Sequence, residues 1–190
     1  ESTRDLDPKL IVDFCAGRGT KTKQLAELHP GAEILATDVN DDRLAGLRTT
    51  FEGHPRVHAV EPGGLRDVHG QVDLLVLDVP CSNTGVMRRR VDVRWRLHAR
   101  ELSVLARAQL DLLQRAARLL PVDGTLVYST CSLEHEENEA VVEKFMRKRR
   151  DFEQEITRTI TPMDDGVDGA FVACLRRVEL DTTSPEPTAC

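Results

Sequence analysis

Two cysteines and one aspartate stand where a parallel sheet would present them to a ligand. Asp78 and Cys81 follow the apolar run 74–77, and Cys131 follows the stretch 125–129. In an open parallel α/β sheet the ligand crevice lies at the carboxyl ends of the strands, so we expect all three side chains to face one pocket. A cysteine thiolate is a nucleophile, whereas a buried cysteine is ordinarily a small apolar residue. Two thiols at strand ends, each flanked by small polar residues, favour the chemical role.

A loop rich in small residues follows the first apolar stretch, 10–14. It reads Cys15, Ala16, Gly17, Arg18, Gly19, Thr20, Lys21 and Thr22. Small residues let the backbone approach a ligand closely, and the start of a helix offers unpaired N–H groups. The loop lacks the third glycine of the dinucleotide fingerprint and the pattern of a P-loop. A plain tight turn therefore remains an alternative to a cofactor cradle.

Asp38 is a second indication of a nucleoside cofactor. It closes the stretch 33–38, about twenty residues beyond the loop, where a carboxylate can accept hydrogen bonds from both hydroxyls of a ribose. The alternative is that Asp38 caps the helix expected to begin near Asp41, although Asn40 could provide that cap instead.

Short apolar runs alternate with helical periods, which predicts one α/β domain with a mostly parallel central sheet and helices on both faces. The expected strands are 10–14, 33–38, 56–60, 72–78, 125–129, 152–159 and 170–178. The expected helices are 21–28, 41–51, a long amphipathic helix over 102–120, and 134–150. In the last of these the acids come first and the bases last, as suits the helix dipole. We expect residues 181–190 to form a flexible tail.

The composition is that of a soluble globular protein. Of 190 residues, 40% are hydrophobic and 31% charged. The apolar runs fall far short of the roughly 20 residues that a membrane helix needs. Five cysteines without a signal-like start favour reduced thiols and a cytoplasmic protein. The formal net charge of −6 is unusual for a protein that grips a polyanion by itself, so contact with nucleic acid must come from local clusters of Lys and Arg.

Several segments together resemble the RsmB/Sun-type RNA cytosine-5 methyltransferases, from about residue 10 to about residue 177. The matching segments are 13–16 with Lys21 and Thr22, 78–82 with Thr84 and Gly85, 86–89 with 95–96, Gln109, 124–132, 136–139 and 168–173. The combination is specific because the Pro-Cys and Thr-Cys pairs of this family are both present, in the family's order.

This resemblance implies a Rossmann-like, S-adenosylmethionine-dependent catalytic domain over residues 1–180, with the N-terminal RNA-binding domain of many family members absent or removed. It implies methylation of carbon 5 of an unstacked cytosine in RNA, with ribosomal RNA as the expected substrate and no metal. Cys131 is then the nucleophile that adds to carbon 6, and Cys81 helps to release the product. Asp78 would hold the polar edge of the cytosine near the methyl donor. Asn83 replaces a small residue of the Pro-Cys loop.

The resemblance also implies a cofactor site. Its expected residues are Cys15, Ala16, Gly17, Arg18, Gly19, Thr20, Lys21, Asp38, Glu61 and Asp78. Lys21 is retained and could contact the methionine carboxylate or the target base. The chain departs from the family's pattern at Gly17, Arg18 and Thr20, where Ala, Pro and Gly are usual. Glu61 stands nearest to where an Asp usually contacts the adenine amine.

The stretch just after Cys81 is the expected RNA contact. It contains Arg88, Arg89, Arg90, Arg94 and Arg96, with Trp95 among them as a stacking surface. A solvated basic loop is the alternative. Lys144, Arg147, Lys148, Arg149 and Arg150 close a helix, where the dipole explains them, so we expect no second RNA site.

Two other functions remain open. A DNA cytosine-5 methyltransferase would use the Pro-Cys thiol as its nucleophile, and the segment Thr130-Cys131-Ser132 argues against it. A non-catalytic module that binds S-adenosylmethionine or RNA would explain the altered first loop. Against this, the chain retains both thiols and Asp78, for which a scaffold has no chemical need.

Overall fold

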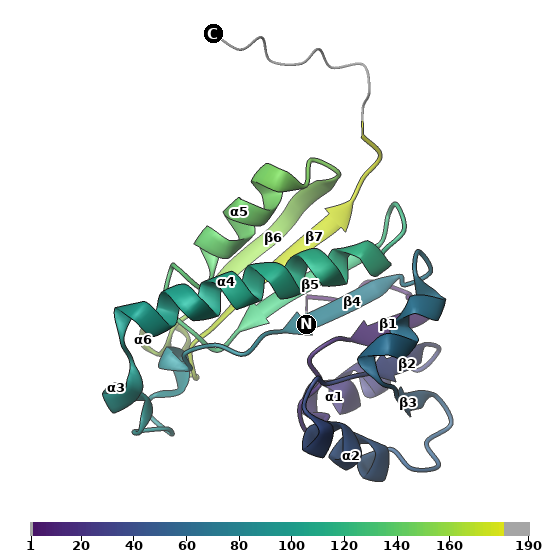
Figure 1. Cartoon of the computed structure of the whole chain (residues 1–190), viewed down its shortest axis with the longest axis horizontal. Coiled ribbons are helices and arrows are strands. Elements are labelled where there is room, and N and C mark those ends of the chain that lie inside the picture. Colours follow the sequence, from purple (N-terminus) through teal and green to yellow (C-terminus); the bar gives the residue numbers. More distant parts are fainter. Residues whose placement is uncertain (1, 181–190) are drawn as a thin grey trace, which may run out of the picture.

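The computed structural model describes residues 2–180, apart from the side chains of Arg96 and Ala99, so the expected tail 181–190 lies outside the described residues. Within this range the strands are β1 (Leu10–Asp13), β2 (Glu33–Ala36), β3 (Val57–Ala59), β4 (Leu74–Asp78), β5 (Thr125–Thr130), β6 (Phe152–Ile160) and β7 (Ala170–Arg177). They form one sheet in the order β3-β2-β1-β4-β5-β7-β6 (Figure 1). The first five strands pair in parallel, and β7 runs antiparallel to both β5 and β6. The predicted mostly parallel α/β sheet is confirmed.

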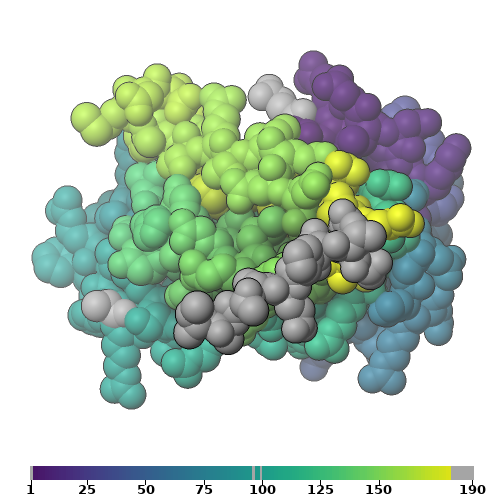
Figure 2. All heavy atoms as spheres, turned by 90° about the horizontal axis from the view of Figure 1, so that it is seen from above, coloured from purple at the N-terminus to yellow at the C-terminus, as the bar shows by residue number. Residues whose placement is uncertain are grey.

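Helices cover both faces of this sheet. The described helices are α1 (Thr20–Leu28), α2 (Asp41–Thr50), α3 (Val93–Arg96), α4 (Ala99–Ala116), α5 (Glu139–Lys148) and α6 (Pro162–Asp165), with 3-10 turns at Pro62–Val68, Thr84–Val86 and Ala117–Leu119. Leu25 of α1 and Leu47 of α2 belong to one apolar core, whereas Leu113 of α4 and Phe145 of α5 belong to the other (Figure 1). Figure 2 views the molecule from the edge formed by α5 and β6.

The central strand β4 explains how the sheet brings a carboxylate to its edge. Its first four residues, Leu74 to Leu77, are buried, as expected for a strand covered on both faces. Asp78 ends the strand and is only half-buried. Because β1, β2, β4 and β5 are parallel, the loops that follow them emerge at the same edge.

Two predicted helices differ from the structure. The helix expected over 134–150 begins only at Glu139, because Glu137 and Asn138 turn their side chains into the protein, where both are buried and hydrogen-bonded. The helix expected over 102–120 begins at Ala99 and tightens into a 3-10 turn after Ala116. No helix of the described residues has the length and apolar character needed to cross a bilayer.

Candidate active site

The loop between β1 and α1 forms the wall of a cavity of about 390 Å³. Gly17 and Gly19 adopt left-handed backbone conformations, with φ of 58° and 81°. A Cβ atom on Gly19 would lie 2.7 Å from Cε2 of Phe51, so the packing of this loop against the end of α2 requires glycine. The lining residues are Asp13, Cys15, Ala16, Gly17, Arg18, Thr20, Lys21, Gln24 and Asp78.

Asp13, at the end of β1, brings an unpaired acceptor to this cavity. Its Oδ2 accepts a hydrogen bond from Thr22 Oγ1 at 2.7 Å, while its buried Oδ1 has no hydrogen-bond partner within residues 2–180. Burial is the main reason that the pKa of Asp13 rises to about 6. A bound group with an N–H donor would satisfy Oδ1. The sequence analysis missed Asp13 as a site residue, although its place at a strand end was a usable signal.

A second cavity, of about 290 Å³, lies beyond the end of β2 and is lined by Asp38, Val39, Asp41, Leu44, Arg48, Glu61, Pro62 and Gly63. Asp38 Oδ2 accepts from the backbone N–H of Gly17 at 3.0 Å, and its Oδ1 accepts from that of Asn40 at 2.9 Å. This carboxylate therefore ties the first loop to the second cavity. The side chain of Asn40 caps α2, so the alternative in which Asp38 is that cap is wrong. Glu61 is exposed and pairs with Arg48 at 3.1 Å.

The predicted cofactor residues divide between these two cavities. Seven of them line the first cavity, Asp38 and Glu61 line the second, and Gly19 lines neither but shapes the loop. Burial raises the pKa of the Cys15 thiol to about 12, so it stays protonated at neutral pH. Within the described part of the chain, no group of three or more His, Cys, Asp or Glu side chains is arranged to hold a metal ion.

The two strand-end thiols meet. Cys81 Sγ and Cys131 Sγ lie 3.2 Å apart, and both residues are half-buried. Asn83 contacts both cysteines, because its Nδ2 donates to the carbonyl oxygen of Cys81 at 2.7 Å and its Oδ1 accepts from Cys131 Sγ at 3.1 Å. The predicted convergence of the two thiols is thus confirmed. Asn83, which stands where the family has a small residue, places its carboxamide in contact with both cysteines.

The two thiols differ in their acidity. A hydrogen bond from Cys81 is the main reason that the pKa of Cys131 is lowered. The same hydrogen bond, followed by burial, raises the pKa of Cys81. Cys131 is therefore the more acidic of the two thiols, and loss of its proton, which also removes the hydrogen bond to Asn83 Oδ1, gives the thiolate, the nucleophilic form of cysteine.

Asp78 lies between the first cavity and the thiols. Its Oδ2 lies 2.5 Å from Lys21 Nζ, and its Oδ1 accepts from Ser129 Oγ at 3.0 Å. The side chain is about one-third exposed, and its charge acts on the Cys131 thiol together with that of Lys21. One acid, one base and two thiols thus share this edge of the sheet.

A buried carboxylate fastens the two thiol loops to each other. Glu137 is fully buried. Its Oε1 accepts from the backbone N–H of Ser82 at 2.9 Å and from Gln109 Nε2 at 2.8 Å. Its Oε2 accepts from Ser132 Oγ at 2.6 Å and from Ser82 Oγ. Because Ser82 follows Cys81 and Ser132 follows Cys131, this carboxylate joins the two segments that carry the sulfurs.

Sequence reasoning assigned no role to this carboxylate. Glu137 stood among the acids of an expected helix start, and its neighbours Glu136 and Glu139 are exposed or half-buried. One signal was available, because Gln109 occupies an apolar phase of the helical period over 102–120. A polar residue on the inner face of a helix must find a buried partner.

The arginine-rich stretch is exposed, and its charges are unevenly engaged. Arg88 and Arg89 pair with Asp168 at 3.5 and 3.0 Å. Trp95 is 77% exposed, and Arg94 is exposed as well. The side chain of Arg96 lies outside the described part of the chain.

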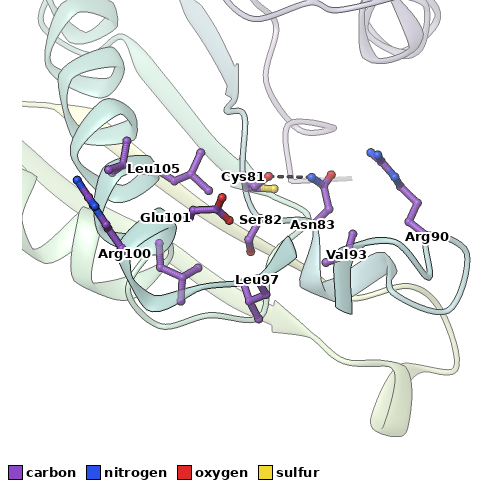
Figure 3. A pocket seen from close by; sticks show the side chains of 11 residues that line it. Cys81, Ser82, Asn83, Arg90, Val93, Leu97, Arg100, Glu101 and Leu105 are labelled. Atoms are coloured by element: carbon purple, nitrogen blue, oxygen red, sulfur yellow. Dashed lines mark hydrogen bonds between the residues drawn. The ribbon is translucent and has the colours of Figure 1, made fainter. Parts of the chain in front are cut away.

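A third cavity, of about 480 Å³, lies between this stretch and α4 (Figure 3). Its lining residues are Cys81, Ser82, Asn83, Arg90, Val93, Leu97, Arg100, Glu101, Leu102, Val104 and Leu105. This cavity touches the Pro-Cys loop and was not predicted. Most of its apolar wall comes from α4 and the short helix α3, which the sequence analysis had not recognised as one surface.

The sequence is similar to a family of methyltransferases. The family model of the 16S rRNA methyltransferase RsmB/F matches residues 4–176. Ribosomal RNA small subunit methyltransferase B of Proteus mirabilis is 34% identical over 173 residues, which cover 88% of this chain and 41% of that protein. Its namesake from Escherichia coli is 35% identical over 161 residues, which cover 82% of this chain and 37% of that protein. The chain thus spans less than half the length of these curated relatives.

Solved structures share the fold. NSun6 from Pyrococcus horikoshii with SFG has a TM-score of 0.77 and 28% identity, covering 91% of this chain and 48% of that one. A methyltransferase homolog protein from Pyrococcus horikoshii has a TM-score of 0.73 and 26% identity, covering 91% of this chain and 64% of that one. These neighbours agree with the Rossmann-like fold expected from the sequence.

Proposed function

Because the chain belongs to the RsmB/F family of 16S rRNA methyltransferases, we propose that it transfers a methyl group from S-adenosylmethionine to carbon 5 of a cytosine in ribosomal RNA. The observation that carries the proposal is the pair of sulfur atoms 3.2 Å apart, with the pKa of Cys131 lowered by Cys81. Carbon 5 of cytosine is a poor nucleophile until a thiolate adds to carbon 6. A thiolate beside a protonated thiol suits this reaction.

The cavities beside β1 and β2 suit S-adenosylmethionine. The orphaned Asp13 Oδ1 can accept from the amino group of the methionine portion, and Lys21 can pair with its carboxylate. In the second cavity, Asp38 can accept from the ribose hydroxyls and Glu61 from the adenine amine. When bound, this cofactor supplies an electrophilic methyl group. The similar NSun6 was solved with SFG, an analogue of this cofactor, which supports the assignment by family.

Cys131 is the proposed nucleophile. Its sulfur forms a bond to carbon 6, and the electron pair of the 5,6 double bond moves into the ring, which makes carbon 5 an enamine carbon that can take the methyl group. Asp78 accepts from the amino group at position 4 and keeps the ring oriented. A base stacked in a duplex could not reach a half-buried thiol, so the cytosine must be unstacked.

Cys81 is the proposed base that releases the product. While Cys131 is a thiolate, its sulfur holds the proton of Cys81 and raises the pKa of that thiol. Once Cys131 is bonded to carbon 6, this cause disappears and only burial still raises the pKa of Cys81, so Cys81 loses its proton to solvent more readily. It then accepts the proton of carbon 5. The C–H electron pair restores the double bond and expels Cys131 as a thiolate.

The exposed arginine stretch is the proposed RNA contact. Arg94 and Trp95 offer charge and a stacking face, and Arg90, which pairs with Asp92 at 3.5 Å, borders the cavity of the Pro-Cys loop. Arg88 and Arg89 are held by Asp168, so they contribute less free charge. RNA contact remains preferable to a merely solvated loop because the stretch borders the cavity that contains Cys81.

Methyl transfer to RNA tests the proposal. The unchanged chain is incubated with labelled S-adenosylmethionine and total bacterial RNA, and the modified base is then identified. We expect 5-methylcytosine from the unchanged chain, none from Cys131→Ala, and a covalent protein–RNA adduct on denaturing gels from Cys81→Ala. An adduct from Cys131→Ala instead would indicate the DNA-type assignment of the nucleophile. Absence of transfer by the unchanged chain would favour a non-catalytic module and refute the proposal.

A further inference from the structure

The cavity between the arginine-rich stretch and α4 is separate from the place of the reacting base. It contains Cys81 and Asn83, but neither Cys131 nor Asp78 is among its lining residues (Figure 3). A cytosine attacked by Cys131 and held by Asp78 must therefore lie on the other side of Cys81. The 480 Å³ of the cavity falls in the range of small-molecule sites, so the space is large enough to receive a ligand of its own.

The position of this cavity beside Cys81 matters because the proposed substrate is a polynucleotide. The nucleotides on either side of the target are joined to it by one phosphodiester each, so one of them must pass the immediate surroundings of Cys81. We propose that this cavity binds the base of a nucleotide adjacent to the methylated cytosine and that Glu101 makes it prefer guanine. The inference rests on the proposed function, because it needs an RNA whose cytosine reacts with Cys131.

The walls of the cavity suit a base. Val93 and Leu102 are buried and Leu97 and Leu105 are half-buried, which gives an apolar surface for the faces of a ring. Arg90 borders the cavity and supplies positive charge near the path of the phosphates. A mostly apolar site with few polar groups selects its ligand through those groups. The choice of base therefore falls to the polar side chains of the lining, which are Ser82, Asn83, Arg90, Arg100 and Glu101.

Glu101 is the one acidic side chain of this lining. It belongs to the first turn of α4, and its carboxylate points toward Ser82 and the Pro-Cys loop (Figure 3). It forms no ion pair within the described residues. A carboxylate only accepts hydrogen bonds. Guanine presents two neighbouring donors, N1–H and the 2-amino group, which can bind both carboxylate oxygens. Adenine and cytosine present one amino group, and uracil one N–H between two carbonyl oxygens that a carboxylate repels.

A randomised RNA tests this preference. The unchanged chain methylates a pool of single-stranded RNA with one fixed cytosine and random bases at the two positions on each side, and sequencing after bisulfite conversion reads the context of each methylated cytosine. We expect guanine to be enriched about tenfold at one of these positions, within the range that one bidentate base contact supports. In Glu101→Gln, which can accept at only one atom, we expect that enrichment to fall to about twofold.

Two further variants sharpen the test. Asp111→Asn removes the same charge from the exposed surface of the same helix, outside the cavity, and should leave the base preference unchanged. Leu105→Phe narrows the cavity and should raise the KM for every flanking base while leaving the melting temperature within a few degrees. Equal base preferences in the unchanged chain and Glu101→Gln would overturn the inference while leaving the proposed function intact. Absence of methylation by the unchanged chain would refute both.

Discussion

Removal of the Glu137 carboxylate is the sharpest test of how the two thiols are held together. The change to alanine deletes the acceptor that joins the loop after Cys81 to the loop after Cys131. The change to glutamine keeps the shape and one acceptor oxygen. If that oxygen takes the place of Oε1, it still accepts from Ser82 N–H and Gln109 Nε2, and the two serine hydroxyls can rotate to accept from the new amide.

The cost can be worked from the donors that are left without a partner. In Glu137→Ala, the backbone N–H of Ser82 loses its acceptor and cannot turn away, and Gln109 Nε2 keeps only the carbonyl oxygen of Pro80. At about 1–3 kcal/mol for each buried donor that loses its partner, the loss is about 2–6 kcal/mol of unfolding free energy. A loss near 4 kcal/mol corresponds to a fall of roughly 8–16 °C in melting temperature for a domain of this size. Glu137→Gln should lose about half as much or less.

Unfolding and thiol reactivity measure two separate consequences. Urea titration and calorimetry give the stability of each variant. Alkylation of Cys131 against pH gives the acidity of its thiol, which depends on the hydrogen bond from Cys81. We expect the alkylation midpoint to move to higher pH in Glu137→Ala, at temperatures where the variant is folded, and to move little in Glu137→Gln.

The outcome that contradicts this reasoning is specific. An alanine variant with unchanged stability would mean that water or rearranged neighbours satisfy the donors. A destabilised alanine variant whose Cys131 keeps its acidity would mean that Glu137 supports the fold without setting the distance between the sulfurs. The first outcome would refute the estimated loss of stability, and the second would refute the assignment of Glu137 as the positioning residue of the thiol pair.

Three further predictions follow from the acidity of two groups and from one turn. Cys81→Ala removes the main cause of the lowered pKa of Cys131, so the pH midpoint of Cys131 alkylation should rise, and an unchanged midpoint would exclude the hydrogen bond as the cause. The pKa of Asp13 is raised from 3.8 to about 6, so the folded protein holds that proton more tightly and stability should fall as pH rises from about 4 to 6. The loss is about 3 kcal/mol. Asp13→Asn should remove that slope in urea titrations at pH 4, 5, 6 and 7, and a retained slope would assign it to other groups. Gly19→Ala should lower the melting temperature more than Gly17→Ala, because both have positive φ but only Gly19 meets Phe51, and equal losses would contradict the clash.

Much of the fold could be predicted because its strands are covered on both faces. The run Leu74 to Leu77 has no polar interruption, and this identifies a buried strand wherever it occurs. The reversed direction of β7 was not predicted: this strand runs antiparallel to both of its neighbours, whereas β6 runs in the same direction as β5. The start of α5 was predicted too early because acids at a helix start are common, and only the tertiary contacts of Glu137 and Asn138 exclude them from the helix.

The part of the candidate site that could be predicted is the placement of residues at the ends of strands. Strand order alone brings Asp78, Cys81 and Cys131 to one edge, and the structure places the two sulfurs in contact. The separation between them could not be read from the sequence, because the two thiol loops are joined through Glu137, in the turn before α5, and Gln109, in α4. The roles of the cofactor residues stay predictions. These residues line or shape the cavities beside Asp13 and Asp38.

The buried carboxylate of Glu137 and the contact between the two thiols are related. Two sulfurs in contact can share one proton, so that one becomes a nucleophile at the expense of the other's acidity, but only while their separation is held near 3.2 Å. Loops are the mobile parts of a fold, and both cysteines lie on or beside loops. A fully buried acceptor between the loops removes that freedom, because any displacement breaks hydrogen bonds that water cannot replace. A polar cluster inside the core at this point is therefore what the chemistry proposed for the thiols requires of the fold.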